Sequence, residues 1–517
     1  MSRRDVVVVG AGHNGLVAAC YLARAGLDVE IVERDTVVGG AVSTVERWPG
    51  VRVDRGSSIH VMVRHTDLVE DLDLGAFGLA YDDVEPWAVL PHPDGPIRFS
   101  SDLEATCGSI GRACGERDAR AYHAFVTAWR PRAAALLEAA AGPPSPGRLM
   151  RAARAAGAGP RHPAELIHTY MEPADHLLAR LFTDTRLRAA LGWWAAQSGP
   201  PPHASGTAPH AGTVALFHLR RAGRPRGGSG RLSEALAARL AAEGGSIRTG
   251  DGAASVVIGE GPRAVVTTGG DRIEARAVLS ACHVIETARL VGDQTAAAAI
   301  RVGNGIGMAV RLLTDRLPAY RVDVPGVHTA MQFLVESPEQ IRAAYGDYLG
   351  GRPAQDPPMI VMTPSATDAT LAPAGRHVVT IWAQWHPRVL RDAHWGDVGE
   401  RVADQLVSAV NRWSPGFADS VLDRYVQTPL ALETELGLIA GNVMHVETEL
   451  DTMFGLRPLP GWSQYRTPHR GLYVCGASTH PGGGVWGVSG RNAAAVVQHD
   501  LKHDRGLLHR AARPSRS

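Results

Sequence analysis

The chain has 517 residues, of which 45% are hydrophobic, so it can bury the cores of two or three globular domains. Acidic and basic residues nearly cancel to a formal net charge of +1, which argues against a nucleic-acid-binding protein. The five cysteines have neither C-x-x-C nor metal-ligand spacing, so we expect a reduced protein without a bound metal. With no signal-peptide pattern and no apolar stretch of the roughly 18 residues that cross a bilayer, we expect a cytoplasmic protein.

Strand and helix patterns alternate over the first 33 residues. Residues 5–9 form an apolar, β-branched run that is typical of a parallel strand buried on both faces. A G-x-G-x-x-G motif at Gly10, Gly12 and Gly15 then opens a helix, and a second strand ends at Glu33. This order predicts a dinucleotide-binding unit rather than a simple glycine-rich turn.

Each part of this unit has a physical task in binding a dinucleotide. Gly10 allows the tight turn, Gly12 leaves room for a pyrophosphate, and Gly15 lets the helix and the strand pack closely. The helix N-terminus offers free N–H groups to the anion, and Glu33 lies where a carboxylate binds a ribose diol. We expect the cofactor also to contact His13, Asn14 and Arg34.

A second pair of glycines, Gly39 and Gly40, follows shortly after the acid. Here the chain resembles FAD-binding oxidoreductases of the two-dinucleotide-binding-domain type, in which this pair runs beside the phosphates and ribityl chain of the flavin. The resemblance implies FAD contacts at Gly39, Gly40 and Ala41. Those proteins often have an arginine just after the pair, which this chain lacks, so the pyrophosphate contact is either missing or supplied by Arg34 or Arg47.

Residues 471–492 read GLYVCGASTHPGGGVWGVSGRN, a strand pattern followed by glycines and by a helix that starts near Val488. Glycines let a backbone lie close to something flat. In the same families this segment passes beneath the isoalloxazine ring, and the start of its helix directs N–H groups at the pyrimidine edge. The resemblance implies flavin contacts at Gly476, Gly483, Gly484, Val485 and Trp486.

The middle of the chain, residues 226–290, contains a glycine-rich turn, an amphipathic helix over 232–242 and further strands. In the resembling proteins the chain re-enters the flavin domain here, which places the backbone near Ala253 at the adenine. A second nucleotide motif is not found, because residues 303–308 (GNGIGM) have Met308 in place of the third glycine. We expect a turn or bulge in a strand there.

Together these segments resemble phytoene-desaturase-like FAD-dependent oxidoreductases. Residues 49–60 and 456–484 are most similar to the branch of pyridine nucleotide-disulfide oxidoreductase domain-containing protein 2. The resemblance implies an α/β flavoprotein with a Rossmann-like, two-dinucleotide-binding-domain FAD domain and an inserted α+β substrate domain with a helical cap. We expect an FAD domain of 1–65, 226–290 and 462–510, a substrate domain of 66–225 and 291–461, and a basic tail of 511–517.

The inserted region 121–167 is rich in Ala, Leu and Arg, and its Pro and Gly residues predict two or three short helices. Arginine beside apolar residues is typical of a surface helix on an anionic membrane or of a lid over an apolar cavity. An ordinary solvated helical cap has the same composition. The sequence therefore leaves a peripheral membrane contact open.

The catalytic candidates are Trp486, His60 and His445. Hydride transfer to a flavin needs a substrate C–H bond held against the ring in a dry slot, while the cofactor supplies the reactivity. Trp486 could form a wall of that slot, or it could pack between the glycine loop and a helix. Each histidine is a candidate acid or base, with a buried structural role as the alternative.

We expect an FAD-dependent dehydrogenase or oxidase that takes a hydride from a lipophilic polyene- or polyketide-like small molecule and forms a C=C bond in natural product biosynthesis. Oxygen or a quinone is the expected electron acceptor. One alternative is a reductive or redox-neutral cyclase or isomerase on a polyene macrolactam-type intermediate, with NAD(P)H as a reductant. Another is an amine oxidase, although Lys502, the only lysine, comes too late for the lysine that many amine oxidases place near the flavin. A flavin-bearing interaction module is the non-enzymatic alternative.

Overall fold

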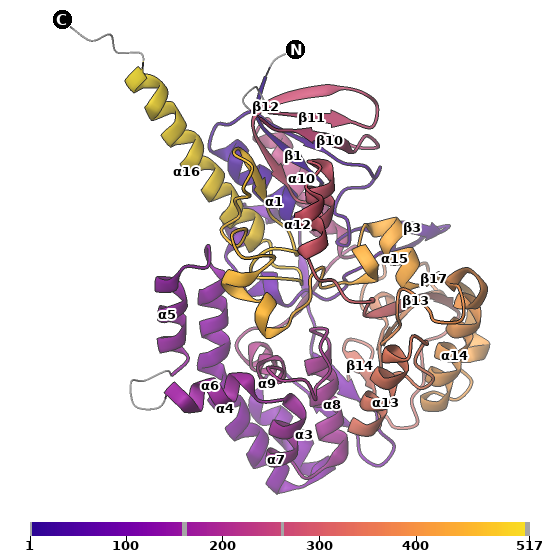
Figure 1. Ribbon diagram of the computed structural model, residues 1–517. Coiled ribbons are helices and arrows are strands. Elements are labelled where there is room, and N and C mark those ends of the chain that lie inside the picture. Colours follow the sequence, from indigo (N-terminus) through magenta and orange to yellow (C-terminus); the bar gives the residue numbers. More distant parts are fainter. Residues whose placement is uncertain (1–2, 158–162, 260–262, 512–517) are drawn as a thin grey trace, which may run out of the picture.

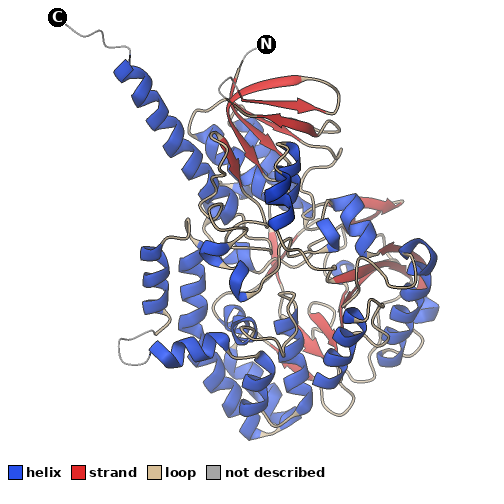
Figure 2. Ribbon diagram, viewed as in Figure 1, coloured by secondary structure: helices blue, strands red, loops and turns tan. Residues whose placement is uncertain are grey.

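The computed structural model describes residues 3–157, 163–259 and 263–511. Two seven-stranded sheets organise these residues, with the glycine-rich N-terminal motif at the first sheet and a group of helices beside the second (Figures 1 and 2). Residues 512–517 of the expected basic tail lie outside the described residues.

The first sheet has the strand order β10-β11-β12-β1-β2-β9, and β18 pairs with the second half of β12. β1 pairs in parallel with both β12 and β2, whereas β10 and β11 form an antiparallel extension. The strands are β1 (Arg4–Val9), β2 (Val29–Val32), β9 (Ser246–Arg248), β10 (Ala253–Val257), β11 (Arg263–Thr267), β12 (Arg272–Ser280) and β18 (Leu472–Val474). All of them lie within the three segments expected for the FAD domain, whose boundaries stay a prediction.

Three helices cover one face of this sheet: α1 (His13–Arg24), α10 (Gly230–Ala242) and α16 (Val488–Ala511). α16 begins at Val488, as predicted, and α10 begins two residues before the predicted start. α11 (Val284–Leu290) contributes to the core on the opposite face, and α12 (Gln294–Ala299) follows it. The buried valines of β1 point alternately into these two cores, which confirms a strand buried on both faces.

The second sheet has the order β17-β13-β16-β15-β14-β6-β7 and is antiparallel except where β14 meets β6. Its strands are β6 (Ala88–Leu90), β7 (Ile97–Phe99), β13 (Gly307–Thr314), β14 (Met331–Leu334), β15 (Met359–Met362), β16 (His377–Gln384) and β17 (Val421–Gln427). Its helices are α13 (Pro338–Leu349), α14 (Trp395–Trp413) and α15 (Pro429–Leu436). The turn predicted at residues 303–308 is confirmed: Gly303 and Gly305 have positive φ just before β13.

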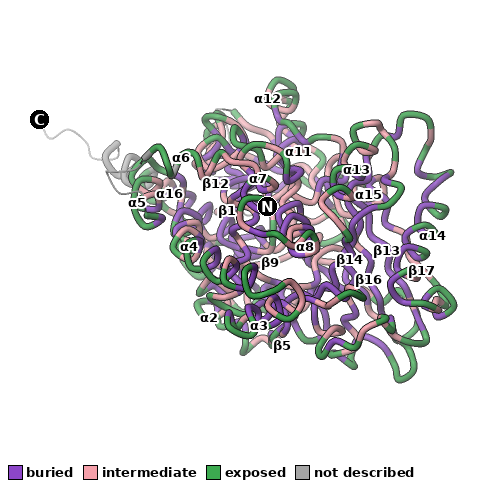
Figure 3. The backbone as a smooth tube through the Cα atoms, turned by 90° about the horizontal axis from the view of Figure 1, so that it is seen from below, coloured by how far each residue is buried: buried purple, intermediate pink, exposed green. Residues whose placement is uncertain are grey.

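Two short ribbons join the halves: β3 (Thr44–Trp48) with β4 (Val51–Asp54), and β5 (Tyr81–Asp83) with β8 (Gly223–Pro225). Figure 3 shows that buried backbone follows the strands of the second sheet, while the outer turns of the helices are exposed. Among the described residues, none of the helices combines the length and the apolar character that crossing a membrane would need.

The helical cap consists of α3 (Leu103–Cys114), α4 (Glu116–Ala140), α5 (Pro146–Ala155), α6 (Pro163–Met171), α7 (Ala174–Leu181), α8 (Thr185–Ala196) and α9 (Ala208–Gly212), after the single-turn α2 (Leu68–Asp71). The prediction of short helices was wrong for α4, which runs for 25 residues through Pro131. Pro131 is exposed, whereas Phe125 and Trp129 on the same helix are buried in the core. Burial of that apolar face outweighs the loss of one helical hydrogen bond.

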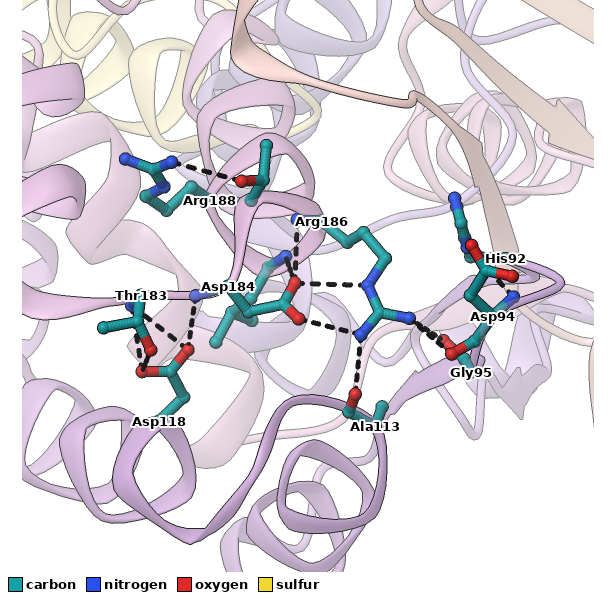
Figure 4. Close-up of polar contacts among 11 residues, drawn as sticks. His92, Asp94, Gly95, Ala113, Asp118, Thr183, Asp184, Arg186 and Arg188 are labelled. Carbon is teal, nitrogen blue, oxygen red and sulfur yellow. Dashed lines mark hydrogen bonds and ion pairs between the residues drawn. The ribbon is translucent and has the colours of Figure 1, made fainter.

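A polar network ties the cap to the second sheet (Figure 4). The fully buried carboxylate of Asp118 on α4 accepts a hydrogen bond from the N–H of Asp184 at 2.7 Å. Asp184 caps α8 and pairs with Arg186 at 2.8 Å. Arg186 also donates to the carbonyl oxygens of Ala113 at the end of α3 and of Asp94 in the β6–β7 turn. These hydrogen bonds and the ion pair therefore fix the cap to the second sheet.

Candidate functional site

The turn between β1 and α1 leaves bare backbone at the carboxyl end of the sheet. Gly10 has φ +99°, a left-handed conformation that favours glycine. A Cβ on Gly15 would collide with the carbonyl oxygen of Gly10, so this glycine allows the close helix packing. A Cβ on Gly12 would meet no atom within 4 Å, which places Gly12 against open space.

The expected ribose and adenine residues lie together at the next edge of the sheet. The Oε2 atom of Glu33 accepts from the N–H of Ala11 at 2.6 Å, so this carboxylate is turned toward the glycine loop. A Cβ on Gly252 would lie 2.7 Å from the Cβ of Arg34. Because Ala253 directly follows Gly252, it is next to Arg34 and close to Glu33.

The second glycine pair lies against the first. Gly39 forms a parallel bridge with Gly12 and donates to the carbonyl oxygen of Ala11 at 2.8 Å. A Cβ on Gly40 would have one neighbour within 4 Å, the Cα of Gly12 at 3.8 Å, and Ala41 follows, partly exposed. The alternative pyrophosphate ligands lie elsewhere: the Arg34 guanidinium is near Gly437, and Arg47 stacks on Tyr425 at 3.9 Å from the ring centroid.

The C-terminal segment returns to this glycine loop. After β18, the N–H of Gly476 donates to the hydroxyl of Ser489 at 2.9 Å, at the start of α16. A Cβ on Gly490 would collide with the carbonyl oxygen of Asn14, so α16 and α1 begin side by side. Gly483, Gly484 and Val485 all keep accessible surface. Segments more than 450 residues apart in the sequence therefore meet, as the resemblance implied.

Trp486 lies at the base of the cap. It is buried in a small cluster with Ala140 and Val488, against which Met62 and Leu137 pack, and its Nε1–H donates to the carbonyl oxygen of Gly483 at 3.0 Å. This is a packing position between the glycine loop and the cap. A contact of Trp486 with substrate stays a prediction.

His60 has no accessible surface, and both of its ring nitrogens have partners. Its Nδ1 is 2.7 Å from the hydroxyl of Tyr81, and its Nε2 is 2.8 Å from the hydroxyl of Ser229. Burial, followed by the charges of His13 and Arg224, lowers the pKa of His60 to about 3. Because His60 is fully buried and both nitrogens are bonded, touching a substrate would require this network to open.

His13 and His445 differ from His60 because both keep accessible surface although burial lowers their pKa values strongly, that of His13 to about 4. The charge of His13 is among the causes that lower the pKa of His445. The neighbour of His445, Met444, would contact a Cβ on Gly483 at 2.7 Å. We use the name recess for the candidate site that Gly12, Gly483 and these two histidines would line.

The recess fits a dinucleotide with a flat ring. Gly12 and Gly40 contribute backbone without side chains and leave room where a phosphate would approach the start of α1. Glu33, Arg34 and Ala253 would hold the ribose and adenine at one end, and Gly483 to Val485 with the start of α16 would face the flavin at the other. These contacts stay predictions for the individual residues.

Three further residues, which the sequence analysis did not single out, surround the segment that contains His445: His283, Arg457 and Ser478. Each is buried and contacts the segment around His445. Their only sequence signal is position, since Ser478 lies inside the predicted flavin segment and Arg457 just before it. Among the described residues, groups of three or more potential metal ligands are not found.

The chain matches the sequence family described as flavin containing amine oxidoreductase over residues 15–415. Pyridine nucleotide-disulfide oxidoreductase domain-containing protein 2 of Rattus norvegicus is 32% identical, over 96% of this chain and 94% of that protein. Hydroxyneurosporene desaturase of Cereibacter sphaeroides is 28% identical, over 96% of this chain and 98% of that protein. A solved structure of a putrescine oxidase variant superposes with a TM-score of 0.60 over 97% of this chain and 99% of that one, at 16% identity, and shows a shared fold.

Proposed function

The chain belongs to the family of flavin containing amine oxidoreductases, and from that premise we propose that it oxidises a lipophilic polyene- or polyketide-like small molecule to form a C=C bond. The predicted family, the FAD cofactor and the oxidoreductase class are confirmed. The substrate, the bond formed and a place in natural product biosynthesis are the proposal. Oxygen or a quinone is the proposed acceptor of the electrons.

The full-length similarity to a desaturase carries this proposal, because it covers the cap and the second sheet as well as the flavin domain. The groups around His445 support it. Burial lowers the pKa values of His13 and His283 to about 4, so both rings are neutral near pH 7, and Arg457 is the cation among the groups that lower the pKa of His445. Neutral rings beside one buried cation suit a neutral substrate better than an ammonium group.

Bound FAD would supply the hydride-accepting chemistry. The residues of the chain would bind and orient the reacting group and exclude water from it. Gly483 and Gly484 offer backbone without side chains, and the cluster of Trp486 with Ala140 of α4 closes the base of the cap. Desaturation releases one hydride and one proton from adjacent carbons, and the proton would leave to a water molecule.

Anaerobic mixing of the purified holoenzyme with a panel of polyenes and amines tests the proposal. Loss of the visible flavin absorbance with a polyene, and new C=C bonds found by mass spectrometry, are the expected results. Reduction by amines alone would replace the proposal with amine oxidation. Turnover that depends on added NAD(P)H would favour the reductive or redox-neutral alternative.

We also propose that the substrate arrives from a membrane surface. Large apolar side chains are exposed on α5 and α6 and on the nearby loop, at Met150, Ile167, Met171, Leu450 and Leu456. Gly206 connects the end of α6 to this loop: its N–H donates to the carbonyl oxygen of Met171, and it lies against Leu450. α5 also carries Arg148, Arg151 and Arg154, which suit an anionic lipid surface.

Sedimentation with vesicles tests this surface. We expect the protein to bind phosphatidylglycerol vesicles and to lose most of that binding in the Met150→Asp, Ile167→Asp double variant. Leu349→Asp on α13, an even more exposed apolar residue outside the surface, is the control. Equal binding by both variants would contradict the proposal.

A further inference from the structure

His445 has a backbone conformation that side chains rarely adopt. Its φ is +66°, in the left-handed region, where histidine is tolerated at a cost. The turn is held by Asn442, whose carbonyl oxygen accepts from the N–H of His445 at 3.0 Å and whose Nδ2 donates to Val302. A strained residue fixed by its surroundings is often one whose side chain must point in a set direction.

Arg457 connects the same turn to the flavin segment by hydrogen bonds. This fully buried guanidinium donates to the carbonyl oxygens of Met444 and Ala477, both at 2.8 Å, and of Glu447 at 2.9 Å. It therefore joins the residues on both sides of His445 to the strand end that leads to Gly483. Arg457 therefore holds the backbone on either side of His445 against the segment that leads to the glycine loop.

His283 fixes the ring from one face. Its Nδ1 accepts from the N–H of Ile285 at 3.2 Å, as the cap of α11, so its proton is on Nε2. That Nε2–H donates to the carbonyl oxygen of His445 at 3.1 Å. The two imidazoles stack with 5.3 Å between centroids and 5° between planes.

Ser478 decides which nitrogen of His445 carries the proton. Ser478 is completely buried, and its hydroxyl oxygen accepts from the N–H of Val284 at 3.3 Å. Its own hydrogen needs an acceptor, and in the described part of the chain the bonded acceptor is Nδ1 of His445 at 3.4 Å. From this pairing we assign Nδ1 as the acceptor, which places the proton of a neutral His445 on Nε2.

The Nε2 side of the ring is the accessible one. Side-chain atoms of His445 keep accessible surface, and its Nε2 is not among the buried polar atoms that lack a partner. Burial, then the charges of His283, Arg457 and His13, holds the pKa of His445 well below its ordinary value, so the ring is neutral. The second recess histidine has the opposite state: Nε2 of His13 accepts from the side-chain amide of Asn14 at 3.0 Å.

From this arrangement we propose that His445 is not a proton-transfer base but a fixed neutral Nε2–H donor, which binds an oxygen atom of the substrate, a carbonyl or hydroxyl close to the C–H bond that is oxidised. Ser478 and His283 are positioning residues for this donor. The oxygen-bearing substrate class rests on the proposed function, whereas the state of the ring does not. A comparable use of a neutral imidazole as a hydrogen-bond donor to a carbonyl is known in enzyme catalysis.

Nitrogen NMR of the ¹⁵N-histidine-labelled holoenzyme tests the state of the ring. The His445 signals are identified by their loss in His445→Gln. We expect an Nε2–H tautomer that does not titrate across the neutral pH range. An Nδ1–H tautomer, or a ring that becomes charged near neutral pH, would overturn the proposal.

Ser478→Ala should shift the tautomer equilibrium of His445 toward Nδ1–H without loss of bound FAD. Ser280→Ala is the matched control, because this equally buried serine bonds Thr287 and not His445. An unchanged tautomer in Ser478→Ala would mean that Ser478 does not position the donor.

Binding of two probes tests the acceptor: β-ionone, which has a ketone, and the hydrocarbon myrcene. We expect His445→Leu to weaken β-ionone binding about tenfold, which is the worth of one hydrogen bond, and to leave myrcene unchanged. His445→Gln places an amide N–H near the position of Nε2 and should restore β-ionone binding. His445→Asn places its amide near the position of Nδ1 and should not restore it. Equal β-ionone affinity in all four proteins, or a change in the flavin spectrum of ligand-free His445→Leu, would overturn the substrate part of the proposal. If neither probe binds, the proposed function fails, and the NMR result still judges the donor.

Discussion

The His60 network and the His445 turn hold their imidazole rings in opposite ways. Both nitrogens of His60 are bonded, to Tyr81 and Ser229, and its ring has no accessible surface. His445 has one nitrogen bonded to Ser478, a strained backbone and an accessible edge. Burial lowers the pKa of both rings, so a low pKa alone does not separate them. The free nitrogen, and the buried groups that aim it, mark the residue that can meet a ligand.

Removing Arg457, which holds the His445 turn in place, should have the largest effect on stability. Arg457→Met leaves the buried carbonyl oxygen of Ala477 without a donor and removes one of the donors to those of Met444 and Glu447, so we expect a loss of about 3 kcal/mol in unfolding free energy. Thermal melting measures it, with Arg424→Met, whose partners are exposed carboxylates, as the control. Equal melting temperatures would show that the turn does not need the guanidinium.

The His60 network should matter for stability rather than for chemistry. His60→Leu leaves the Tyr81 hydroxyl without its partner and removes one of the partners of the Ser229 hydroxyl, which keeps Ser57. We expect a loss of about 2 kcal/mol, with turnover per bound flavin unchanged within about twofold. His445→Leu should instead lower turnover, with a loss of about 1 kcal/mol because the buried Ser478 hydroxyl loses its acceptor. A fall in turnover for His60→Leu beyond that caused by lost protein would assign His60 a catalytic role.

His60 should contribute to the pH dependence of stability. Its folded pKa of about 3 lies below the unfolded value of about 6.5, so between these values the unfolded chain binds a proton that the folded chain does not. Stability therefore falls as the pH falls, by up to about 1.4 kcal/mol per pH unit for this group. Melting of wild type and His60→Leu at several pH values should show a shallower slope in the variant. Parallel slopes would contradict the assignment.

Tyr81→Phe should give the smallest change. It removes one hydroxyl from Nδ1 of His60 and keeps the ring under Arg64, so we expect a loss of about 1 kcal/mol. Tyr21→Phe is the control, because its hydroxyl bonds an exposed carboxylate. A loss for Tyr81→Phe as large as that for His60→Leu would mean that the network acts as one unit.

The flavin half could be predicted from the sequence because its signals are local. The spacing of Gly10, Gly12 and Gly15 follows from one turn, and the start of α16 at Val488 follows from the glycines before it. The state of His445 could not be predicted, since it depends on a serine 33 residues away and on a backbone N–H that precedes it by 161 residues. The length of α4 was missed because Pro131 is tolerated by burial of the opposite face, which only the tertiary structure shows.

The central claim is that FAD lies in the recess between Gly12 and Gly483. The direct test is the amount of FAD bound per chain in Gly12→Val, because the new side chain enters open space and φ of Gly12 is −61°, so the fold loses only about 1 kcal/mol at the helix cap. Gly147→Val on the exposed part of α5 is the control. We predict one FAD per chain in wild type and control, and little or none in a folded Gly12→Val. A Gly12→Val protein that keeps its full complement of FAD would place the cofactor elsewhere and contradict the account.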